Sequence, residues 1–462
     1  MLARVRTAGL QGVDALPVMV EVGITHGLPS FTVVGLPQSA VREGRERVLS
    51  ALRHLGVSLP PRRITVNLAP ADHPKEGTGF DLPLAVALLV AAGEVPPYAV
   101  RDMGFSGELG LDGALRPVRG VLARVAGCRE AGAASVVVSR ENAPEAGAVP
   151  GVEVRWARDL AQLRACLRGE GEWPPPVLPR KNRGAASAPD LSEVKGQALA
   201  KRALEVAAAG GHNLVLVGPP GVGKTLLARR LPGLLPPLQD GEAMEVTRIL
   251  SAAGLLPEGA GLVRQRPFRA PHHSVSDAGL VGGGSPPRPG EVTLAHRGVL
   301  FLDELPEFRR NVLELLRQPL EDGVVHLVRA RGAMSFPAHF TLVAAMNPCP
   351  CGWLGHPTRS CLCDPTQVAR YRGRVSGPLL DRIDLQVAAS PVVPGPWDPD
   401  PTAEGSEVVR GRIARARERQ RHRFGPHGPV VNGDMGPREL RRWVRVPAGV
   451  AALLQQAQDR LG

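Results

Sequence analysis

Apolar and polar residues follow two periodicities along the first third of the chain. Apolar residues at helical spacing among charged ones predict a helix over residues 40–55 and another over 119–131. The uninterrupted apolar run 82–92 predicts a buried helix, because it is too short to cross a membrane. A first unit of mixed helices and strands is therefore expected over residues 1–168. Its strands are predicted from short apolar runs at 18–22, 31–34, 64–68 and 135–138.

The pattern changes after residue 168. Residues 169–189 are rich in proline and then in basic and small residues, which is typical of a linker. From 190 to 395 short apolar strands alternate with helices, which predicts an α/β unit whose parallel sheet carries helices on both faces. Residues 404–462 predict helices with one buried stripe, formed by Val408, Val409, Ile413 and Ala416.

A phosphate-binding motif lies between the first strand and the next helix of this α/β unit. The sequence after the apolar run 212–217 fits the pattern G-x-x-x-x-G-K-[ST] without a mismatch. In such a loop the backbone N–H groups surround the phosphates, the lysine adds a positive charge and the hydroxyl binds Mg²⁺. An accidental glycine-proline turn is the alternative, and the flanking strand and helix disfavour it. The predicted nucleotide site comprises Gly218, Pro219, Pro220, Gly221, Val222, Gly223, Lys224 and Thr225.

Two carboxylates form the second half of the predicted site. The apolar strand 298–302 ends in Asp303 and Glu304. We expect Asp303 to hold Mg²⁺ next to Thr225, and Glu304 to activate the attacking water as a general base. A helix N-cap is the alternative for an isolated Asp-Glu pair. Because the pair follows a phosphate loop, the catalytic interpretation is favoured.

Three further segments resemble parts of AAA+ ATPases. Residues 190–197 resemble their first helix. The strand 340–346 ends at Asn347, where these proteins carry a polar residue that orients the attacking water. Arg382 lies in a segment similar to the one bearing their arginine finger, which stabilises transition-state charge on the ATP of a neighbouring subunit. This resemblance implies a ring, whereas the alternative is an ordinary surface salt bridge.

Two inserted segments are expected to face the pore of such a ring. Residues 268–284 are polar and glycine-rich and contain His272 and His273, which we do not expect to share a metal because neighbours on one strand or helix point apart. Residues 323–333 alternate like a hairpin. Arg329 and Arg331 would lie on one face of it and contact DNA phosphates, or the hairpin is simply solvated.

Six cysteines are distributed unevenly along the chain. Cys128 and Cys166 are isolated, which does not suggest a secreted disulfide framework. The N-terminus also lacks a signal peptide and no segment can span a membrane, so a cytoplasmic protein is expected. Two Cys-x-Cys pairs follow Asn347 and could supply four thiolates to Zn²⁺, or they are reduced thiols. These pairs are Cys349 with Cys351 and Cys361 with Cys363.

The net charge of +12 arises almost entirely from arginine. A basic chain is compatible with a nucleic-acid partner. Genome composition is the alternative explanation for the preference for arginine over lysine.

Short sequence segments in the first unit resemble the N-terminal domain of YifB/ComM-type proteins. That domain is an α+β Lon-protease-like domain of the ribosomal S5 domain 2-like class. The segments are residues 33–37, 73–82 and 107–110. The resemblance places Gly79 where a Lon protease has its serine nucleophile and Arg124 where it has its lysine. Glycine has no nucleophile and arginine stays protonated, so a binding or assembly module is expected in place of a protease.

Further phrases at 269–274, 290–298 and 347–352 extend the resemblance over nearly the whole chain, to the YifB/ComM family of magnesium-chelatase-like AAA+ ATPases. The resemblance implies ATP and Mg²⁺ as cofactors, a hexameric homo-oligomer, and a motor acting on branched or single-stranded DNA. A ComM-like helicase that promotes branch migration in recombination and natural transformation is the favoured expectation. The alternatives are a chelatase-type motor working with partner proteins in metal insertion, and a nucleotide-dependent scaffold without turnover.

The C-terminal segment differs from the family pattern. Family members continue past a segment like 451–457 into a helix that bears a sensor-2 arginine. Because this sequence ends at Gly462, the helical lid at 404–462 is expected to be truncated and to close less well on ATP.

Overall fold

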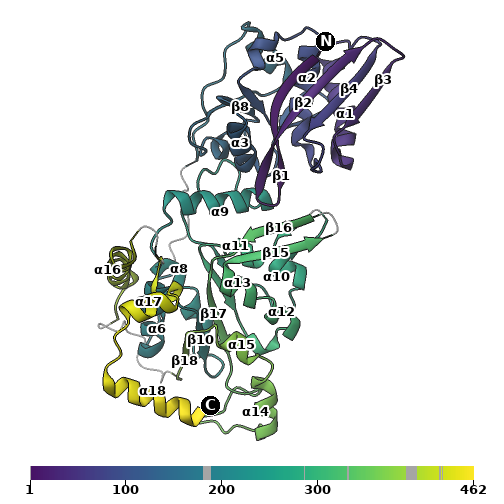
Figure 1. The fold of residues 1–462 in the computed structure, drawn as a ribbon. Coiled ribbons are helices and arrows are strands. Elements are labelled where there is room, and N and C mark those ends of the chain that lie inside the picture. The colour runs from purple at the N-terminus through teal and green to yellow at the C-terminus, as the bar shows by residue number, and fades with distance from the viewer. Residues whose placement is uncertain are drawn as a thin grey trace.

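The computed structural model describes residues 2–180, 189–285, 287–329, 332–391, 403–425, 428 and 430–461. The N-terminal part is built on a seven-stranded mixed sheet in the order β3-β4-β2-β1-β5-β8-β9 (Figure 1). Its strands are β1 (Leu2–Gln11), β2 (Asp14–Thr25), β3 (Ser30–Val34), β4 (Arg63–Ala69), β5 (Met103–Phe105), β8 (Ser135–Val138) and β9 (Glu153–Trp156), beside the small hairpin of β6 (Glu108–Leu109) and β7 (Leu115–Arg116). Its α-helices are α1 (Ser39–His54), α2 (Asp81–Ala91), α3 (Val121–Glu130), α4 (Ala143–Ala146) and α5 (Leu160–Arg168).

Helices cover both faces of this sheet. Val5 belongs to the core shared with α1 and α2, whereas Ala8 of the same strand belongs to the core shared with α3. Residues an odd number of positions apart in a strand face opposite sides of the sheet, so β1 contributes to both cores. Every residue of α2 is buried, as its apolar run predicts. The helices predicted at 40–55 and 119–131 and all four predicted strands are confirmed.

The second part is built on a five-stranded parallel sheet in the order β11-β14-β17-β10-β18. Leu214 of β10 packs into the core on one face, and Val215 packs into the core on the other. Helices on both faces of a parallel sheet are thus confirmed. The strands are β10 (Leu214–Val217), β11 (Phe268–Arg269), β14 (Val299–Leu302), β17 (Thr341–Met346) and β18 (Leu385–Ala388).

Several short helices and two hairpins surround this sheet. The helices are α6 (Ala198–Gly210), α7 (Lys224–Ala228), α8 (Leu231–Leu234), α9 (Asp240–Ala253), α10 (Asp277–Val281), α11 (Glu291–Leu294), α12 (Arg310–Glu314), α13 (Arg317–Asp322), α14 (Pro365–Arg372) and α15 (Gly377–Leu380). The hairpins are β12 (Gly282–Gly283) with β13 (Arg288–Pro289), and β15 (Val324–Arg329) with β16 (Gly332–Pro337).

Two details of the helical segments differ from the sequence predictions. The segment 190–197 is not an α-helix, because only Leu191–Glu193 forms a 3₁₀ turn and α6 begins at Ala198. In the C-terminal segment, Val409 and Ile413 of α16 (Ser406–Phe424) are buried as predicted, but Val408 is 56% exposed. Two further helices follow, α17 (Pro437–Trp443) and α18 (Ala448–Leu461). Among the helices of the described ranges, none is both long enough and apolar enough to cross a membrane.

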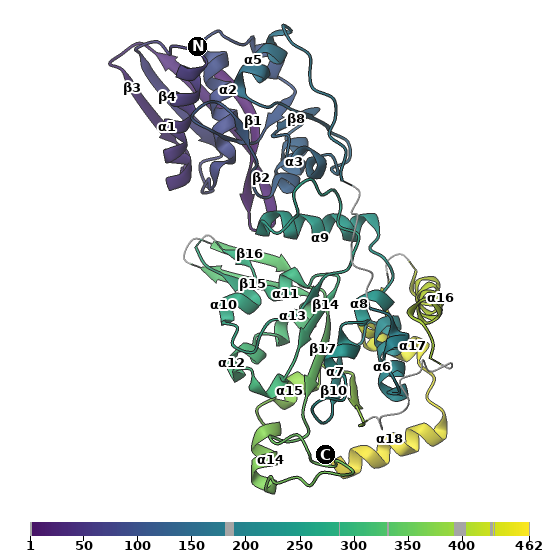
Figure 2. The same ribbon diagram turned by 180° about the vertical axis from the view of Figure 1, so that it is seen from behind.

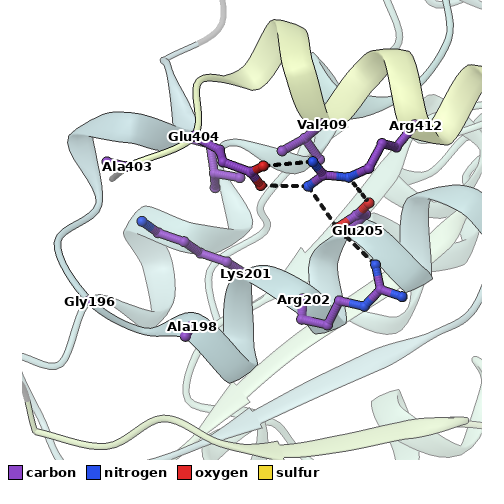
Figure 3. Close-up of a pocket in the computed structure, with 10 residues that line it drawn as sticks. Gly196, Ala198, Lys201, Arg202, Glu205, Ala403, Glu404, Val409 and Arg412 are labelled. Carbon is purple, nitrogen blue, oxygen red and sulfur yellow. Dashed lines mark hydrogen bonds and ion pairs between the residues drawn. The ribbon is translucent and has the colours of Figure 1, made fainter. Parts of the chain in front are cut away.

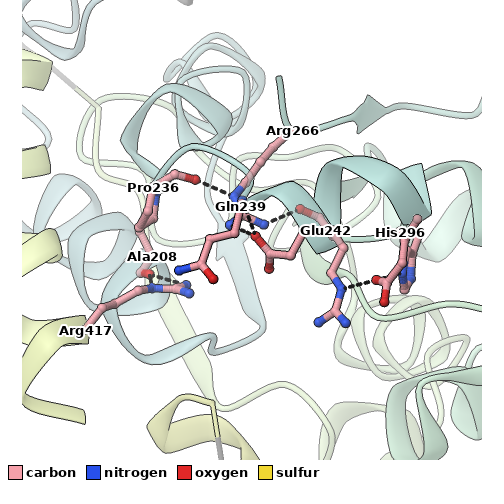
Figure 4. Close-up of polar contacts among 9 residues, drawn as sticks. Ala208, Pro236, Gln239, Glu242, Arg266, His296 and Arg417 are labelled. Carbon is pink, nitrogen blue, oxygen red and sulfur yellow. Dashed lines mark hydrogen bonds and ion pairs between the residues drawn. The ribbon is translucent and has the colours of Figure 1, made fainter. Parts of the chain in front are cut away.

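Helix α9 lies between the two parts of the molecule (Figures 1 and 2). Polar contacts fix it to the second part: Glu242 pairs with Arg266 at 3.0 Å, and Arg266 also donates to the carbonyl oxygen of Pro236 (Figure 4). On its other side, Ser251 hydrogen-bonds to Glu145, and Arg248 pairs with Asp14 at 2.7 Å.

The tip of the β1–β2 hairpin completes this contact between the two parts. Val13 is 1% exposed and packs within a hydrophobic core of the second part. The neighbouring Gly12 lies against the ring of the buried Phe336 in β16. We call this set of contacts, from Gly12, Val13 and Asp14 to α9 and β16 together with Glu145–Ser251, the domain seam.

Candidate functional site

The predicted phosphate loop joins β10 to α7 at the carboxyl edge of the parallel sheet. Gly223 has φ of 88°, a left-handed conformation that glycine adopts without steric cost. At Gly218 a Cβ atom would collide with the carbonyl oxygen of Ala389. The chain can therefore follow this path from β10 into the loop only with glycine at position 218. These two glycines let the loop turn back over the start of α7, where the first backbone N–H groups of a helix have no partner within the helix and can bind an anion.

Lys224 lies buried inside the loop. Its ammonium donates to the carbonyl oxygens of Gly218 at 2.6 Å and Pro219 at 2.9 Å, and to Asn347 Oδ1 at 3.1 Å. Burial lowers the pKa of Lys224, while the nearby charges of Asp303 and Glu304 oppose that shift. The structure thus brings Asn347, at the end of β17, directly to the lysine of the phosphate loop.

Thr225 and Asp303 meet across the same edge of the sheet. The hydroxyl of Thr225 donates to Asp303 Oδ2 at 2.6 Å. A hydroxyl and a carboxylate side by side are the hard oxygen ligands that Mg²⁺ prefers, and Mg²⁺ commonly binds through one or two such groups together with nucleotide phosphates. The residues present therefore fit the predicted Mg²⁺ site.

Glu304 follows Asp303 in a left-handed backbone conformation, with φ of 53°. Its backbone N–H donates to Asp303 Oδ1 at 3.0 Å, and its own side chain is 59% exposed. The carboxylate thus extends into solvent beside the predicted Mg²⁺ ligand, where a water molecule can reach it.

His273 is a site residue that the sequence analysis did not assign to catalysis. Its Nδ1 lies 3.7 Å from Glu304 Oε2. The rings of His272 and His273 are 4.0 Å apart, contrary to the expectation that neighbouring side chains point apart, because both residues lie in a turn and not in a strand or helix. The segment 268–284 is also not one loop, since it includes α10. A histidine so close to a candidate base was detectable only once the fold joined the two segments.

Arg382 lies at the opposite edge of the sheet from the phosphate loop. Its carbonyl oxygen accepts from Asn213 Nδ2 at 2.8 Å, just before β10 begins, whereas the phosphate loop follows the end of β10. A strand rises by about 3.3 Å per residue, so the four residues of β10 separate the two edges by roughly 10 Å. The guanidinium pairs with Glu321 at 2.6 Å within the same chain.

The predicted hairpin at 323–333 is confirmed, with β15 and β16 paired from Val324–Pro337 to Arg329–Gly332. Its second strand continues to Pro337, beyond the predicted end. Arg331 and the side chain of Arg329 lie outside the described residues.

In the N-terminal part, the structure places Gly79 and Arg124 in direct contact. A Cβ atom on Gly79 would lie 2.8 Å from Arg124 Nη1, so the guanidinium occupies the space of a side chain at that position. Arg124 Nη1 donates to the carbonyl oxygen of Ala8 at 2.7 Å. Burial lowers the pKa of Arg124 to about 10, which still leaves the guanidinium protonated at neutral pH.

The four late cysteines gather at one point. Their sulfur atoms all lie within 4.8 Å of one another, and Cys349 is buried. Cys349 Sγ is 3.4 Å from Cys351 Sγ and 3.6 Å from Cys361 Sγ. Among the described residues, no other group of three or more cysteine, histidine or acidic side chains has its potential ligand atoms this close together. His272 and His273 therefore do not form part of such a group.

A cavity of about 440 Å³ is lined by residues of α6 and of the C-terminal helix α16 (Figure 3). Arg412 spans it by pairing with Glu205 at 2.6 Å and with Glu404 at 2.6 Å. Nearby, Gln197 donates to the carbonyl oxygens of Val222 at 3.0 Å and Ser390 at 2.7 Å. The start of α6 is thereby tied to the phosphate loop, and α16 is tied to α6.

Comparison with protein families matches three models to the chain. The model described as "Magnesium chelatase, subunit ChlI" matches residues 190–394. The model "Subunit ChlI of Mg-chelatase" matches residues 20–142, and "Magnesium chelatase, subunit ChlI C-terminal" matches residues 403–462.

Relatives align over almost the full length of this chain. An uncharacterized protein of Mycobacterium tuberculosis is 45% identical over 460 residues, covering 99% of this chain and 91% of that protein. The uncharacterized protein YifB of Escherichia coli is 43% identical, covering 100% and 90%. The competence protein ComM of Haemophilus influenzae is 42% identical, also covering 100% and 90%.

A partial similarity concerns the N-terminal part. A Lon protease of Salinispora arenicola is 30% identical over 153 residues, which are 31% of this chain and 19% of that protein. The full-length matches are decisive for classification. The chain belongs to the YifB/ComM family of magnesium-chelatase-like AAA+ ATPases.

Proposed function

We propose that this protein is a ring-forming motor that hydrolyses ATP to move on branched or single-stranded DNA, and that it promotes branch migration during recombination or natural transformation. The contact between Thr225 and Asp303, beside Lys224 and Asn347, is the observation that carries the ATPase part of the proposal. These groups supply a Mg²⁺ ligand pair, a phosphate-binding cation and a polar group beside the phosphate site.

The proposed ring follows from the position of Arg382. Phosphoryl transfer commonly uses an additional arginine to stabilise transition-state charge. Arg382 lies at the far edge of its own sheet, so it cannot reach its own phosphate loop without refolding that edge. With 48% of its side chain exposed, it is accessible to a neighbouring subunit. We therefore propose that it acts at the active site of that neighbour, in the six-subunit ring that the family resemblance implies.

Three observations support DNA as the substrate of the motor. The ComM relative is named a competence protein and aligns along this whole chain. The net charge is +12, which favours a polyanionic partner. The paired strands β15 and β16 form a hairpin, and Arg329 at the end of β15 and Arg331 two positions later in the sequence are the residues proposed to contact phosphates.

The N-terminal part is proposed to serve assembly or binding, and not proteolysis. Arg124 fills the space beside Gly79, so neither a nucleophile nor a neutral base is present at the two positions that correspond to the Lon pair.

The decisive measurement is the rate of ATP hydrolysis with and without a four-way DNA junction. We expect the junction to stimulate hydrolysis, and the stimulation to fall when Arg329 and Arg331 are both replaced by alanine. The exposed Arg101, far along the chain from the hairpin, provides a matched control as Arg101→Ala. Stimulation only by a tetrapyrrole-binding partner would favour a chelatase motor, and an absence of hydrolysis under all conditions would favour a scaffold.

A further inference from the structure

The cysteine cluster occupies the loop between β17 and α14, immediately after the candidate sensor residue Asn347. We propose that Cys349, Cys351, Cys361 and Cys363 bind one structural zinc ion, which fixes this loop against the phosphate loop.

The spacing of the sulfur atoms fits one tetrahedral ion. With Zn–S bonds of 2.3 Å, tetrahedral geometry places the sulfurs about 3.8 Å apart. The separations are 3.4 Å for Cys349–Cys351, 3.6 Å for Cys349–Cys361 and 3.6 Å for Cys351–Cys361, and Cys363 lies within 4.8 Å of the others. A disulfide would require about 2.05 Å, so no pair is bonded in this arrangement.

Backbone N–H groups point at the sulfurs as they do around thiolate ligands. The N–H of Leu354 donates to Cys349 Sγ at 3.4 Å, and those of Trp353 and Leu362 are directed at Cys351. Hydrogen bonds to a charged acceptor are about twice as strong as those to a neutral one, so these donors would stabilise sulfur atoms bound to a metal ion. Metal thiolates also carry excess negative charge, which such donors stabilise.

The loop has little else to hold it together. Between the two cysteine pairs, the described chain forms no helix or strand. Trp353 stacks with Arg359 at 4.3 Å and meets His356 edge-on at 5.1 Å, while Leu362 is exposed. Segments without an apolar core of their own commonly depend on a bound metal for their fold.

The ion would influence the ATP site by holding the cysteine loop in place, and it would take no part in the reaction itself. Four protein ligands leave no open coordination site, which is typical of structural zinc. Gly352 packs so closely on the phosphate loop that a Cβ atom there would lie 2.6 Å from Pro220 Cδ, and 3.8 Å from Asn347 Cγ. This role in positioning Asn347 rests on the proposed ATPase function.

The test is the metal content of the full-length protein, purified without a metal-affinity tag and under reducing conditions. We expect one zinc per chain in the parent protein and in Cys166→Ser, whose cysteine lies outside the cluster. Cys361→Ser should lose zinc at least tenfold more readily to a chelating dye. A zinc content far below one per chain, stoichiometric iron, or a disulfide in the cluster under these conditions would overturn the proposal.

Because Cys361→Ser could fail to fold, cobalt offers a second measurement on the unmodified chain. The zinc-depleted protein should bind one Co²⁺ and develop the absorption bands of a tetrahedral tetrathiolate site. Octahedral cobalt bands, or none, would contradict the site.

The functional consequence is measured separately. Zinc removal should lower the turnover of ATP by at least tenfold while ATP binding changes less than threefold, and added zinc should restore turnover. Turnover that is unaffected by zinc removal would refute the positioning role. If the zinc-loaded protein hydrolyses no ATP at all, the metal site stands and the proposed function fails.

Discussion

Glu304 adopts a backbone conformation that costs residues with a side chain about 1 to 3 kcal/mol. The surrounding structure maintains it: the N–H of Glu304 donates to Asp303, and the carboxylate faces His273 at 3.7 Å. Such a cost is common where a side chain must be aimed at a reacting group. Glu304 thus differs from an ordinary surface glutamate in its left-handed backbone conformation.

Replacing Glu304 by glutamine should therefore remove hydrolysis and leave nucleotide binding intact. The amide keeps the shape but cannot accept a proton from water, so we expect turnover to fall about 10²- to 10⁴-fold. Single-turnover hydrolysis and fluorescent-nucleotide binding measure the two steps. The control is Glu307→Gln, whose carboxylate pairs with Arg374 at 2.9 Å. Equal turnover losses in both variants would contradict the assignment of Glu304 as the base.

Gly79 is a second residue whose position can be tested alone. An alanine there would place a Cβ atom 2.8 Å from the guanidinium of Arg124, which is buried and donates a hydrogen bond to the carbonyl oxygen of Ala8. We expect Gly79→Ala to destabilise the N-terminal part by about 1 to 3 kcal/mol. Gly411→Ala is the control, because a Cβ atom there meets nothing within 4 Å. Urea unfolding followed by tryptophan fluorescence compares the two, and equal midpoints would disprove the close contact.

At the scale of elements, α9 is joined to the sheet by a hydrogen-bonded chain through two histidines. The backbone N–H of His339 donates to His296 Nδ1 at 3.1 Å, which places the His296 proton on Nε2. That proton is donated to Glu245 of α9 at 3.0 Å. The hydrogen bond from His296 lowers the pKa of Glu245 to about 2, while burial lowers the pKa of His296 itself.

This contact predicts a pH dependence with a definite sign. A carboxyl whose pKa is lowered in the folded state stabilises the fold above its ordinary pKa of 4.5, and the contribution is lost as the pH falls through about 2. Because the side chain of Glu245 is 37% exposed, we expect only about 1 to 2 kcal/mol between the parent and Glu245→Gln at pH 7. The difference should close between about pH 5 and pH 2. A difference that persists at pH 2, or one equal to that of the exposed control Glu418→Gln, would refute it.

Elements specified by neighbouring residues could be predicted from the sequence, whereas elements that depend on pairing with distant segments could not. The strand at 135–138 and the helix at 82–92 were predictable because local apolar patterns specify them. The long strand β1 went unpredicted, although it is central to the first sheet and contributes to two cores. Its residues Arg4, Arg6 and Thr7 break the apolar run, and only pairing with β2 and β5 makes it a strand.

The same limit applies to the candidate site. The phosphate loop and the Asp303–Glu304 pair have recognisable local sequences, so each could be proposed in advance. The approach of His273 to Glu304 and the ion pair of Arg382 with Glu321 join residues from different segments. Such contacts depend on the order of the strands in the sheet, which a local sequence pattern does not determine.

At the scale of the whole molecule, the domain seam makes the two parts interdependent. Val13 belongs to the N-terminal hairpin but is buried in the core of the second part. Burying a charge at such a place without a partner costs several kcal/mol, so Val13→Asp should separate the parts without unfolding either. Hydrogen exchange at the amides of α9 should then rise at least tenfold on the side facing Asp14.

The control for this variant is Leu28→Asp in the neighbouring β2–β3 loop, because Leu28 is 88% exposed. It should leave exchange in α9 unchanged. Unaltered exchange in Val13→Asp, or the same increase in both variants, would show that the seam does not hold the two parts together.

The packing of Gly12 on Phe336 has a mechanical consequence. Phe336 lies in β16, the returning strand of the hairpin proposed to grip DNA. A force applied to that hairpin is therefore resisted by the ten residue pairs between β1 and β2 as well as by the pairing of β15 with β16. The N-terminal sheet thereby braces the hairpin. In the proposed ring, the N-terminal sheet of each subunit would stiffen that subunit's own hairpin in this way.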